Sequence, residues 1–388
     1  MKIQEVASKY EKYQVEMRRY FHQYPEVSEK EYETSKAIKA ELDKMGIPWV
    51  PCGLETGVLG TIKGSKPGKT ILLRADIDAL SVEETTGAEY ASKNPGVMHA
   101  CGHDCHISML LTAAHILNDM KDELCGTVKL AFQPAEEVAM GAKSMIEHGA
   151  LEGVDAAFGI HIWSDVPAGH ISCSDGPRMA STDQFKIDIK GKGCHGAAPH
   201  QGIDAVVVAT AVINNLQAMV SRQTAPLEPI VVTVGKVEAG TRWNVVAENA
   251  HLEGTTRCFS QEVWDAIPEM MEKIVKNTSA AFGAEVSVSF DRLTPPTIND
   301  VGMAALTRAA ADKIMGEGAA IDSPATMGGE DFAFYGQRVP AAIALLGGGN
   351  EACGAVWPQH SGNFCIDESV LIKGAMLYAQ VAMDHNAK

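Results

Sequence analysis

The densest group of reactive side chains is the segment His99-Ala-Cys101-Gly-His103-Asp104-Cys105-His106, which places three imidazoles and two thiols within eight residues. Imidazole and thiolate are ligands that suit zinc and other first-row divalent ions. Cys101 and His103 are two residues apart, so a turning loop can aim both at one centre, and Gly102 allows the tight turn. The alternative is a helix N-terminus with a buried thiol and surface histidines.

Two adjacent carboxylates, Glu136 and Glu137, follow the predicted strand 127–132, which Pro134 ends. Both should therefore lie at the carboxyl end of that strand. In a metal site, one glutamate can bind the ion while the other moves protons to and from water. The alternative is a solvated pair at the start of a helix, where the helix dipole favours negative charge.

Four more polar side chains follow other predicted strands. Asp76 and Asp78 come after one strand, where a carboxylate either caps the next turn or orients a histidine that binds metal. His161 is predicted at the end of another strand, and His360 lies downstream of a third. A single histidine in such a position is more often structural. The hypothesis of a metal site rests on the fact that all these groups fall at predicted strand ends.

The hydrophobic pattern explains how residues so far apart could meet. Strand-like and helix-like stretches alternate up to residue 181 and again after residue 293, which predicts an α/β fold with a mainly parallel sheet and helices on both faces. In such sheets, ligands bind beyond the carboxyl ends of the strands. Near the N-terminus, Ser28 and Glu31 form a capping-box pattern, which predicts that a helix starts there. The predicted strands of this sheet are 57–62, 70–73, 127–132, 156–160 and 341–346.

A different pattern occupies the middle of the chain. Residues 182–292 read as β-α-β-β-α-β, the order of a split ferredoxin-like unit. We therefore predict a discontinuous catalytic domain formed by residues 1–181 and 293–388, and an inserted domain formed by residues 182–292.

The composition restricts the expected partners and location. The chain of 388 residues is 46% hydrophobic and has a formal net charge of −16. Nucleic acid and anionic membrane surfaces need a basic face, so neither is expected as a partner. No signal peptide and no uninterrupted apolar run of about 18 residues is evident. Nine scattered cysteines then indicate reduced thiols, and we expect a cytoplasmic protein.

Taken together, these motifs resemble the M20 metallopeptidase family, in particular its amidohydrolase branch of hippurate hydrolases, N-acetyl amino acid deacetylases and auxin-conjugate hydrolases. The cysteine-containing loop is the specific part, since relatives in other branches place a carboxylate ligand there. The resemblance implies a zinc-peptidase-like α/β fold with an inserted ferredoxin-like lid or dimerisation domain. The matching motifs span nearly the whole chain in order: His22-Gln-Tyr-Pro-Glu26, Leu73-Arg-Ala-Asp-Ile-Asp-Ala79, Met98-His-Ala-Cys-Gly-His-Asp104, Phe132-Gln-Pro-Ala-Glu-Glu137, Gly193-Cys-His-Gly-Ala-Ala-Pro-His200, Gly328-Gly-Glu-Asp-Phe-Ala333 and His360-Ser361.

Carried over residue by residue, the resemblance implies a role for each candidate in the catalytic domain. Glu136 would be the general base. Asp76 and Asp78 would lie behind the metal ligands and orient them. The implied metal ligands are Cys101, His103, Glu137, His161 and His360.

The inserted domain would contribute groups that contact the substrate. The resemblance implies that His195 polarises the scissile carbonyl, and that Asn244 and Arg257 hold the substrate carboxylate. An arginine suits that task because its planar fork can grip a carboxylate through two hydrogen bonds. Taken by itself, Arg257 could also form a surface salt bridge on a strand.

The resemblance also implies two divalent metal ions per subunit (zinc, manganese, nickel or cobalt) and a homodimer or homotetramer. The expected reaction cleaves the amide bond of an N-acyl amino acid, with an acetyl, benzoyl or similar group, to a carboxylic acid and a free amino acid. Three alternatives stay open. They are a metallo-dipeptidase or aminoacylase of the same fold, an inactive metal-binding protein, and an enzyme whose nucleophile is Cys101 or Cys194.

Overall fold

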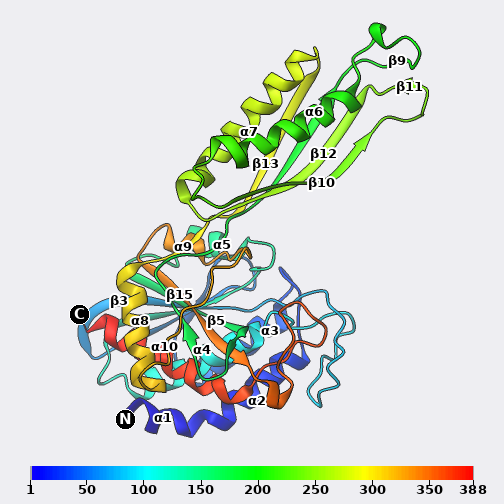
Figure 1. Ribbon diagram of the computed structural model, residues 1–388. Coiled ribbons are helices and arrows are strands. Elements are labelled where there is room, and N and C mark those ends of the chain that lie inside the picture. The colour runs from blue at the N-terminus through cyan, green and yellow to red at the C-terminus, as the bar shows by residue number, and fades with distance from the viewer. Residues whose placement is uncertain (1, 388) are drawn as a thin grey trace. The chain divides into compact units, whose positions relative to one another are not determined.

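The computed structural model describes residues 2–387 and divides into two compact units, which we describe one at a time (Figure 1). The first unit takes in the chain up to Gly176, Ile298–Pro324 and the chain from Asp331 onward. The second takes in Pro177–Thr297 and Ala325–Glu330. The predicted insertion of residues 182–292 thus lies inside the second unit, which extends beyond it at both ends and adds a short later segment.

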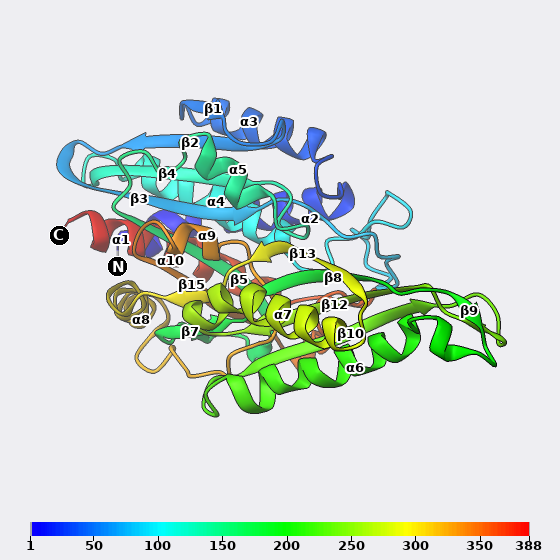
Figure 2. The same cartoon turned by 90° about the horizontal axis from the view of Figure 1, so that it is seen from above.

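The centre of the first unit is a seven-stranded sheet (Figure 2). Its strands are β1 (Trp49–Pro51), β2 (Val58–Lys63), β3 (Lys66–Asp76), β4 (Cys125–Gln133), β5 (Ala156–Pro167), β6 (Ile171–Ser172) and β15 (Ala341–Gly349). They are arranged in the order β1-β2-β4-β3-β5-β15-β6. The central strands β4, β3, β5 and β15 run parallel, and the outer strands are antiparallel to their neighbours. The predicted mainly parallel sheet is therefore confirmed.

Helices cover both faces of this sheet. They are α1 (Lys2–Ala7), α2 (Glu11–Gln23), α3 (Tyr32–Lys44), α4 (His103–Asp119), α5 (Gly141–Glu147), α8 (Val301–Met315), α9 (Ala333–Gly336) and α10 (Leu371–Asn386). Ile71 and Leu73 of β3 belong to the large core beneath α4 and α10, whereas Leu72 belongs to a smaller core beneath α5 and α9 (Figure 1). Side chains alternate between the faces along a strand, so a strand buried on both sides reads as a continuous hydrophobic run.

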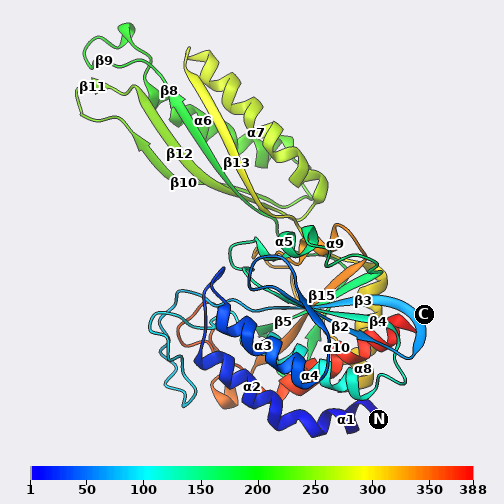
Figure 3. The ribbon, with the colours of Figure 1, turned by 180° about the vertical axis from the view of Figure 1, so that it is seen from behind.

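The second unit is a four-stranded antiparallel sheet with two helices on one face (Figure 3). Its main elements are β8 (Thr182–Lys190), α6 (Ala205–Ala218), β10 (Ile230–Ala239), β12 (Asn249–Cys258), α7 (Gln261–Ala281) and β13 (Glu285–Thr294). The strand order β10-β12-β8-β13 and the chain order β-α-β-β-α-β are those of a split ferredoxin-like unit. Phe185, Ile187 and Ile189 of β8 form its core with residues of α6 and α7.

Short elements complete the chain. They are the strands β7 (Gly176–Met179), β9 (Cys194–His195), β11 (Val245–Val246) and β14 (Thr297–Asn299), and the single turns η1 (Ser8–Tyr10), η2 (Pro199–Gln201), η3 (Met219–Gln223), η4 (Glu351–Cys353) and η5 (Glu368–Val370).

The segment Ala205–Gln223, formed by α6 and η3, is long and apolar enough to cross a membrane by length and composition. In the structure it packs on the sheet of the second unit, with Val208, Val212 and Leu216 fully buried. One side of the segment therefore belongs to the core of the second unit, and 33% of its apolar window is buried.

The predicted capping box at Ser28 and Glu31 is wrong. Helix α3 begins at Tyr32, and Glu31 at its N-cap position makes no capping hydrogen bond. Ser28 instead donates its hydroxyl hydrogen to Asp78, and Glu31 accepts the backbone N–H of Ala135. Both partners belong to loops that are distant in sequence, so the local spacing could not reveal them.

Gly254 of β12 shows how closely the second unit is packed. A methyl group on its α-carbon would lie 2.1 Å from Cζ of Phe185 and 2.3 Å from the carbonyl oxygen of Thr233. We expect Gly254→Ala to lower the free energy of unfolding by about 1–3 kcal/mol, because the added carbon overpacks the core. Gly235→Ala is the control, since nothing lies within 4 Å of its added methyl group. Urea unfolding followed by circular dichroism compares the two, and equal effects would contradict this account.

Candidate metal centre

The loop before α4 turns sharply at Gly102, which brings Cys101 and His103 to one place. Gly102 has a φ of +89° and is the N-cap of α4, whose first residue is His103. A side chain at Gly102 could not fit, because its β-carbon would lie 2.3 Å from Ile162. Cys101 Sγ lies 3.5 Å from Nε2 of His161 on β5. The tight turn predicted at this glycine is therefore present, beside a third candidate ligand.

His161 lies inside β5, so the prediction that it ends a strand is wrong. β5 continues to Pro167 because it stays paired with β15 after its pairing with β3 has stopped at Gly159. Nδ1 of His161 donates to the carbonyl oxygen of Ile162 at 2.7 Å, which leaves Nε2 as an acceptor. Burial, together with the neighbouring His106, lowers the pKa of His161 well below its usual value. The ring is therefore neutral, as metal ligation requires.

Glu137 joins the group from the loop after β4. Its Oε1 lies 3.9 Å from Nε2 of His103 and 3.6 Å from Nε2 of His360. Glu137 Oε1 and His103 Nε2 are both buried, and neither has a hydrogen-bond partner among residues 2–387. Such unsatisfied buried groups are rare in folded proteins. A cation between them would satisfy both.

His360 comes from the loop that follows β15. Its φ of +66° is unusual for a residue with a side chain, and such strained backbone is concentrated at functional sites. The His360 N–H donates to the carbonyl oxygen of Ala100 at 2.8 Å, next to Cys101. This hydrogen bond ties the His360 loop to the Cys101 loop.

The structure therefore brings all five predicted ligands together in the first unit. Burial raises the pKa of the Cys101 thiol well above its usual value, and the Glu137 carboxylate adds to the rise. A thiolate at this position needs a cation beside it. Thiol, imidazole and carboxylate donors together fit a first-row divalent ion. Ligand atoms of the described residues lie within 4.8 Å of one another in five groups. Four of these groups contain a predicted ligand: Cys101, His103 and His161; Asp76, His103 and His106; Cys101, Glu137 and His360; and His103, Glu136 and Glu137.

Asp78 links two of these candidate ligands. Nδ1 of His103 donates to the Asp78 carbonyl oxygen at 2.9 Å and lies 3.3 Å from one carboxylate oxygen, which leaves Nε2 facing Glu137. The other carboxylate oxygen accepts the Glu137 N–H at 3.0 Å and the Ser28 hydroxyl at 2.7 Å. Burial opposes the ionisation of Asp78, but the hydrogen bond from His103 lowers its pKa. This arrangement is typical of a carboxylate that orients a metal-binding histidine.

Asp76 contacts His106, which belongs to the segment 99–106 but is not one of the five predicted metal ligands. One Asp76 oxygen bonds Nδ1 of His106, and the other accepts from Arg74 at 2.7 Å and lies 3.4 Å from Nε2 of His103. Nε2 of His106 accepts the N–H of Ile162 at 2.8 Å. The spacing of His103 and His106, three residues apart on one helix face, was a signal that could have paired them.

The other members of the segment 99–106 support the packing of the first unit. Burial lowers the pKa of His99 to about 4, and His99 belongs to none of these groups of potential ligands. Cys105 lies in the large hydrophobic core. Asp104 Oδ2 forms an ion pair with Nε of Arg18 at 2.9 Å and lies 2.8 Å from Nδ1 of His22. The buried thiol of Cys105 agrees with the alternative interpretation, but His99, His103 and His106 are buried, not on the surface as that interpretation expected.

In the second unit, His195 and Asn244 lie side by side, and Arg257 lies apart from them. β9 pairs with β11, which places His195 opposite Val245, and the Gly196 N–H donates to the carbonyl oxygen of Asn244 at 2.9 Å. Nδ1 of His195 accepts the N–H of Ala197 at 3.0 Å, so its exposed Nε2 is left as a donor. Arg257 lies near the opposite end of β12, after the strand has crossed the sheet.

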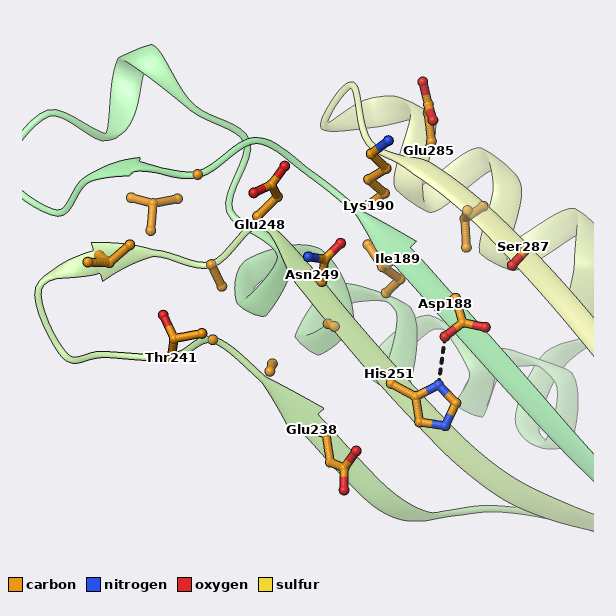
Figure 4. Close-up of a pocket in the computed structure, with 18 residues that line it drawn as sticks. Asp188, Ile189, Lys190, Glu238, Thr241, Glu248, Asn249, His251, Glu285 and Ser287 are labelled. Carbon is orange, nitrogen blue, oxygen red and sulfur yellow. Dashed lines mark hydrogen bonds and ion pairs between the residues drawn. The ribbon is translucent and has the colours of Figure 1, made fainter.

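A hollow of about 840 Å³ lies on the open face of the sheet in the second unit (Figure 4). None of the predicted site residues line it. His251 on its wall lies 2.7 Å from Asp188 and 3.1 Å from Glu253, and the hydrogen bond to Asp188 raises its pKa. This surface is an ion-paired sheet face, and size alone does not make it the reactive site.

The fold and the site define a class of protein. An α/β domain with a cluster of metal-ligating side chains at its sheet, and a second carboxylate beside the cluster, has the equipment of a metal-dependent hydrolase. Residues 72–384 match the model of peptidase family M20/M25/M40. The chain belongs to this family.

Relatives match over almost the whole chain. Thermostable carboxypeptidase 1 of Saccharolobus solfataricus is 40% identical over 382 residues, which cover 96% of this chain and 95% of that protein. N-acetyl-L-cysteine deacetylase of Bacillus subtilis is 42% identical over 365 residues, which cover 94% and 86%. The solved structure of the YXEP protein of Bacillus subtilis, a dinuclear metal binding peptidase from the M20 family, has a TM-score of 0.85 and 36% identity and covers 97% of this chain and 98% of its own. The family and these relatives make this chain a hydrolase of amide bonds.

Cys101 and Cys105 offer a matched test of the metal centre, because both thiols are buried and only Cys101 faces the other candidate ligands. We expect Cys101→Ala to bind substantially less divalent metal than the unsubstituted protein after dialysis, because a ligand has been removed. Cys105→Ala should bind as much as the unsubstituted protein. Plasma mass spectrometry of the dialysed proteins measures the content. Equal metal content in both variants would remove Cys101 from the centre.

Proposed function

We propose that this protein is a metal-dependent amidohydrolase that cleaves the amide bond of N-acyl amino acids, releasing a carboxylic acid and a free amino acid. The observation that carries the proposal is the position of Glu136, a carboxylate within 4.8 Å of the ligand atoms of His103 and Glu137. A site that only bound metal would have no need of this extra base. The deacetylase relative supports an N-acyl substrate, and the carboxypeptidase relative supports the alternative of a peptide substrate.

The cofactor in this proposal is a pair of divalent metal ions. Such ions, when bound, lower the pKa of water and polarise an amide carbonyl. The thiol favours zinc, and manganese, nickel and cobalt are the alternatives. The residues that would hold the pair are Cys101, His103, Glu137, His161 and His360.

Glu136 would act as the general base. Its Oε1 accepts the N–H of Asp331 at 3.3 Å, which limits the directions in which the carboxylate can turn. It would take a proton from the attacking water as the oxygen–carbon bond forms. It would then deliver that proton to the leaving nitrogen as the carbon–nitrogen bond breaks. Asp76 and Asp78 would keep the ligands in place during both steps.

The second unit would supply groups for the substrate. His195 would donate its Nε2 hydrogen to the developing oxyanion, a contribution that is typically about 3–4 kcal/mol. An unchanged kcat in a His195→Gln variant would remove this role. Asn244 and Arg257 would bind the substrate carboxylate. The Arg257 guanidinium donates only to neutral acceptors of Thr255 and Thr256 and forms no ion pair within the described chain, so its charge is available.

The proposed assembly is a homodimer, or a homotetramer built from it, and the proposed location is the cytoplasm. The nine free thiols support a reducing compartment. The exposed side of α6 and η3 supports association, because no charged residue occurs between Asp204 and Arg222. The exposed side chains of this patch are three valines interspersed with uncharged polar residues such as Thr210, Asn214 and Gln217. The depletion of charged residues is typical of the core of an interface. The large apolar residues of the patch are Val206, Val207 and Val220, with exposed fractions of 43%, 50% and 37%.

A charge on this patch tests the dimer. We expect Val207→Glu to shift the protein from dimer to monomer, because an unpaired carboxylate would be buried in the interface. Val301→Glu is the control, since Val301 is 65% exposed on α8 of the first unit. Sedimentation equilibrium measures both. A monomer before any substitution, or a Val207→Glu dimer, would contradict the proposed surface.

Replacement of the base tests the reaction. We expect Glu136→Gln to lower kcat for N-acyl amino acids by at least about 10²-fold, because proton transfer is lost, while its metal content is unchanged. Amine release from a panel of N-acetyl and N-benzoyl amino acids and of dipeptides measures this, with chelated protein as a second control. Activity within tenfold of the unsubstituted protein would exclude Glu136 as the base. Release from dipeptides alone would move the substrate to the peptide alternative.

A further inference from the structure

The carboxylate of Glu31 is completely buried at the start of α3, yet it makes no hydrogen bond to that helix. Its Oε1 accepts the N–H of Ala135 at 2.9 Å and the N–H of Glu29 at 3.0 Å. Its Oε2 accepts the hydroxyl of Thr56 at 2.8 Å. All the donors to this carboxylate are uncharged. The Glu31 carboxylate therefore restrains the main chain, and it does so at Ala135, the residue just before Glu136.

Ala135 needs such a restraint. Its φ is +52°, in the left-handed region that residues with a side chain rarely adopt. Strained backbone of this kind persists only where surrounding contacts determine it. The carbonyl oxygen of Ala135 accepts the N–H groups of Met140 and Gly141, at 3.1 and 3.2 Å. The hydrogen bond to Glu31 restrains the N–H group of the same residue, so the peptide groups on both sides of the Ala135 α-carbon are restrained.

The next carboxylate in the loop is held separately. The Glu137 N–H donates to Asp78, not to Glu31, at 3.0 Å. Two buried carboxylates thus accept backbone N–H groups on either side of Glu136: Glu31 accepts that of Ala135, and Asp78 accepts that of Glu137. Loss of the hydrogen bond to Glu31 should disturb the backbone before Glu136 and leave the candidate metal ligand Glu137 bonded to Asp78.

We propose that Glu31 is a positioning residue for Glu136. Acting through the N–H of Ala135, it aims the Glu136 carboxylate at the reacting water. This inference rests on the proposed function, in which Glu136 is the base. Misplacement of a catalytic group by about 1 Å can cost about 10²-fold in rate. The rate should therefore depend on Glu31, whereas metal binding should not.

Glutamine can replace glutamate here without loss of a hydrogen bond. Its carbonyl oxygen can accept from Ala135 and Glu29, and its amide can donate to the Thr56 hydroxyl, which is able to accept as well as donate. Alanine leaves both backbone N–H groups without an acceptor. The pair Glu31→Gln and Glu31→Ala therefore separates the hydrogen bonds from the charge.

Glu26 provides the matched control. It also accepts backbone N–H groups beside the start of α3, those of Glu33 at 3.2 Å and Thr34 at 2.8 Å, but none from the loop that carries Glu136. Glu26→Ala should lower the stability of α3 and leave the position of Ala135 unchanged. It reports what a purely structural loss near α3 does to the rate.

The experiment measures kcat and KM for amine release, metal content by mass spectrometry, and amide hydrogen exchange in the peptide 134–141, for the full protein and the three variants. We expect Glu31→Ala to lower kcat about 10- to 100-fold. Its KM and metal content should stay unchanged, and exchange in 134–141 should be faster. Glu31→Gln should keep kcat within about threefold and keep the slow exchange, and Glu26→Ala should do the same.

Several results would overturn the proposal. An unchanged kcat in Glu31→Ala would do so, as would equal losses in Glu31→Gln and Glu31→Ala, because rescue by glutamine would then be absent. A kcat loss of the same size in Glu26→Ala would reduce Glu31 to a structural residue. If the unsubstituted protein released no amine from any substrate, the proposed function would fail, while unchanged exchange in 134–141 would still refute the positioning of the loop by Glu31.

Discussion

The geometry of the site depends on the hydrogen bonds that Asp78 accepts. This buried carboxylate accepts hydrogen bonds from Nδ1 of His103, from the backbone N–H of Glu137 and from the hydroxyl of Ser28. Burial of a carboxylate is costly unless donors surround it, so the three donors cannot leave without a large penalty. The N-terminus of α4, the loop after β4 and the segment before α3 are thereby held to one group. Separation of any one of them would leave the Asp78 carboxylate with fewer hydrogen-bond donors.

The sheet makes this convergence possible. The parallel strands β3, β4, β5 and β15 contribute or lead to every candidate ligand of the first unit, and α4 begins among them. Behind α4, a second buried network ties it to α2, where Arg18 and His22 both contact Asp104. Removal of one partner from a buried pair typically costs about 3–5 kcal/mol, so this network fixes the start of the helix that carries His103. Two layers of buried charged groups, around Asp78 and around Asp104, thus restrain the candidate ligands.

Much of this could be predicted from the sequence, because the relevant signals are local. The hydrophobic run before Pro134 predicted the strand that delivers Glu136 and Glu137, and Gly102 predicted the turn between Cys101 and His103. The errors have a common physical cause. Ser28 and Glu31 have the spacing of a capping box, but their partners lie in loops that only the folded chain brings near. The length of β5, and with it the place of His161, depended on pairing with β15, which is about 180 residues away in the chain. No local pattern in the sequence could predict these contacts between segments that lie far apart in the chain.

The charges collected here link metal binding to folding. Asp76 and Asp78 are buried, Glu136 and Glu137 are partly buried close to them, and Cys101 adds a thiol whose ionisation burial opposes. Arg74 neutralises part of this charge through Asp76, and His103, whose pKa Asp76 raises despite burial, neutralises another part. Ionised groups so close together in a medium of low dielectric constant repel one another unless cations stand between them. Without metal, protons can neutralise this charge, but they then occupy the same atoms that would bind metal. Binding of divalent cations should therefore release protons from the centre and add their binding free energy to the stability of the first unit.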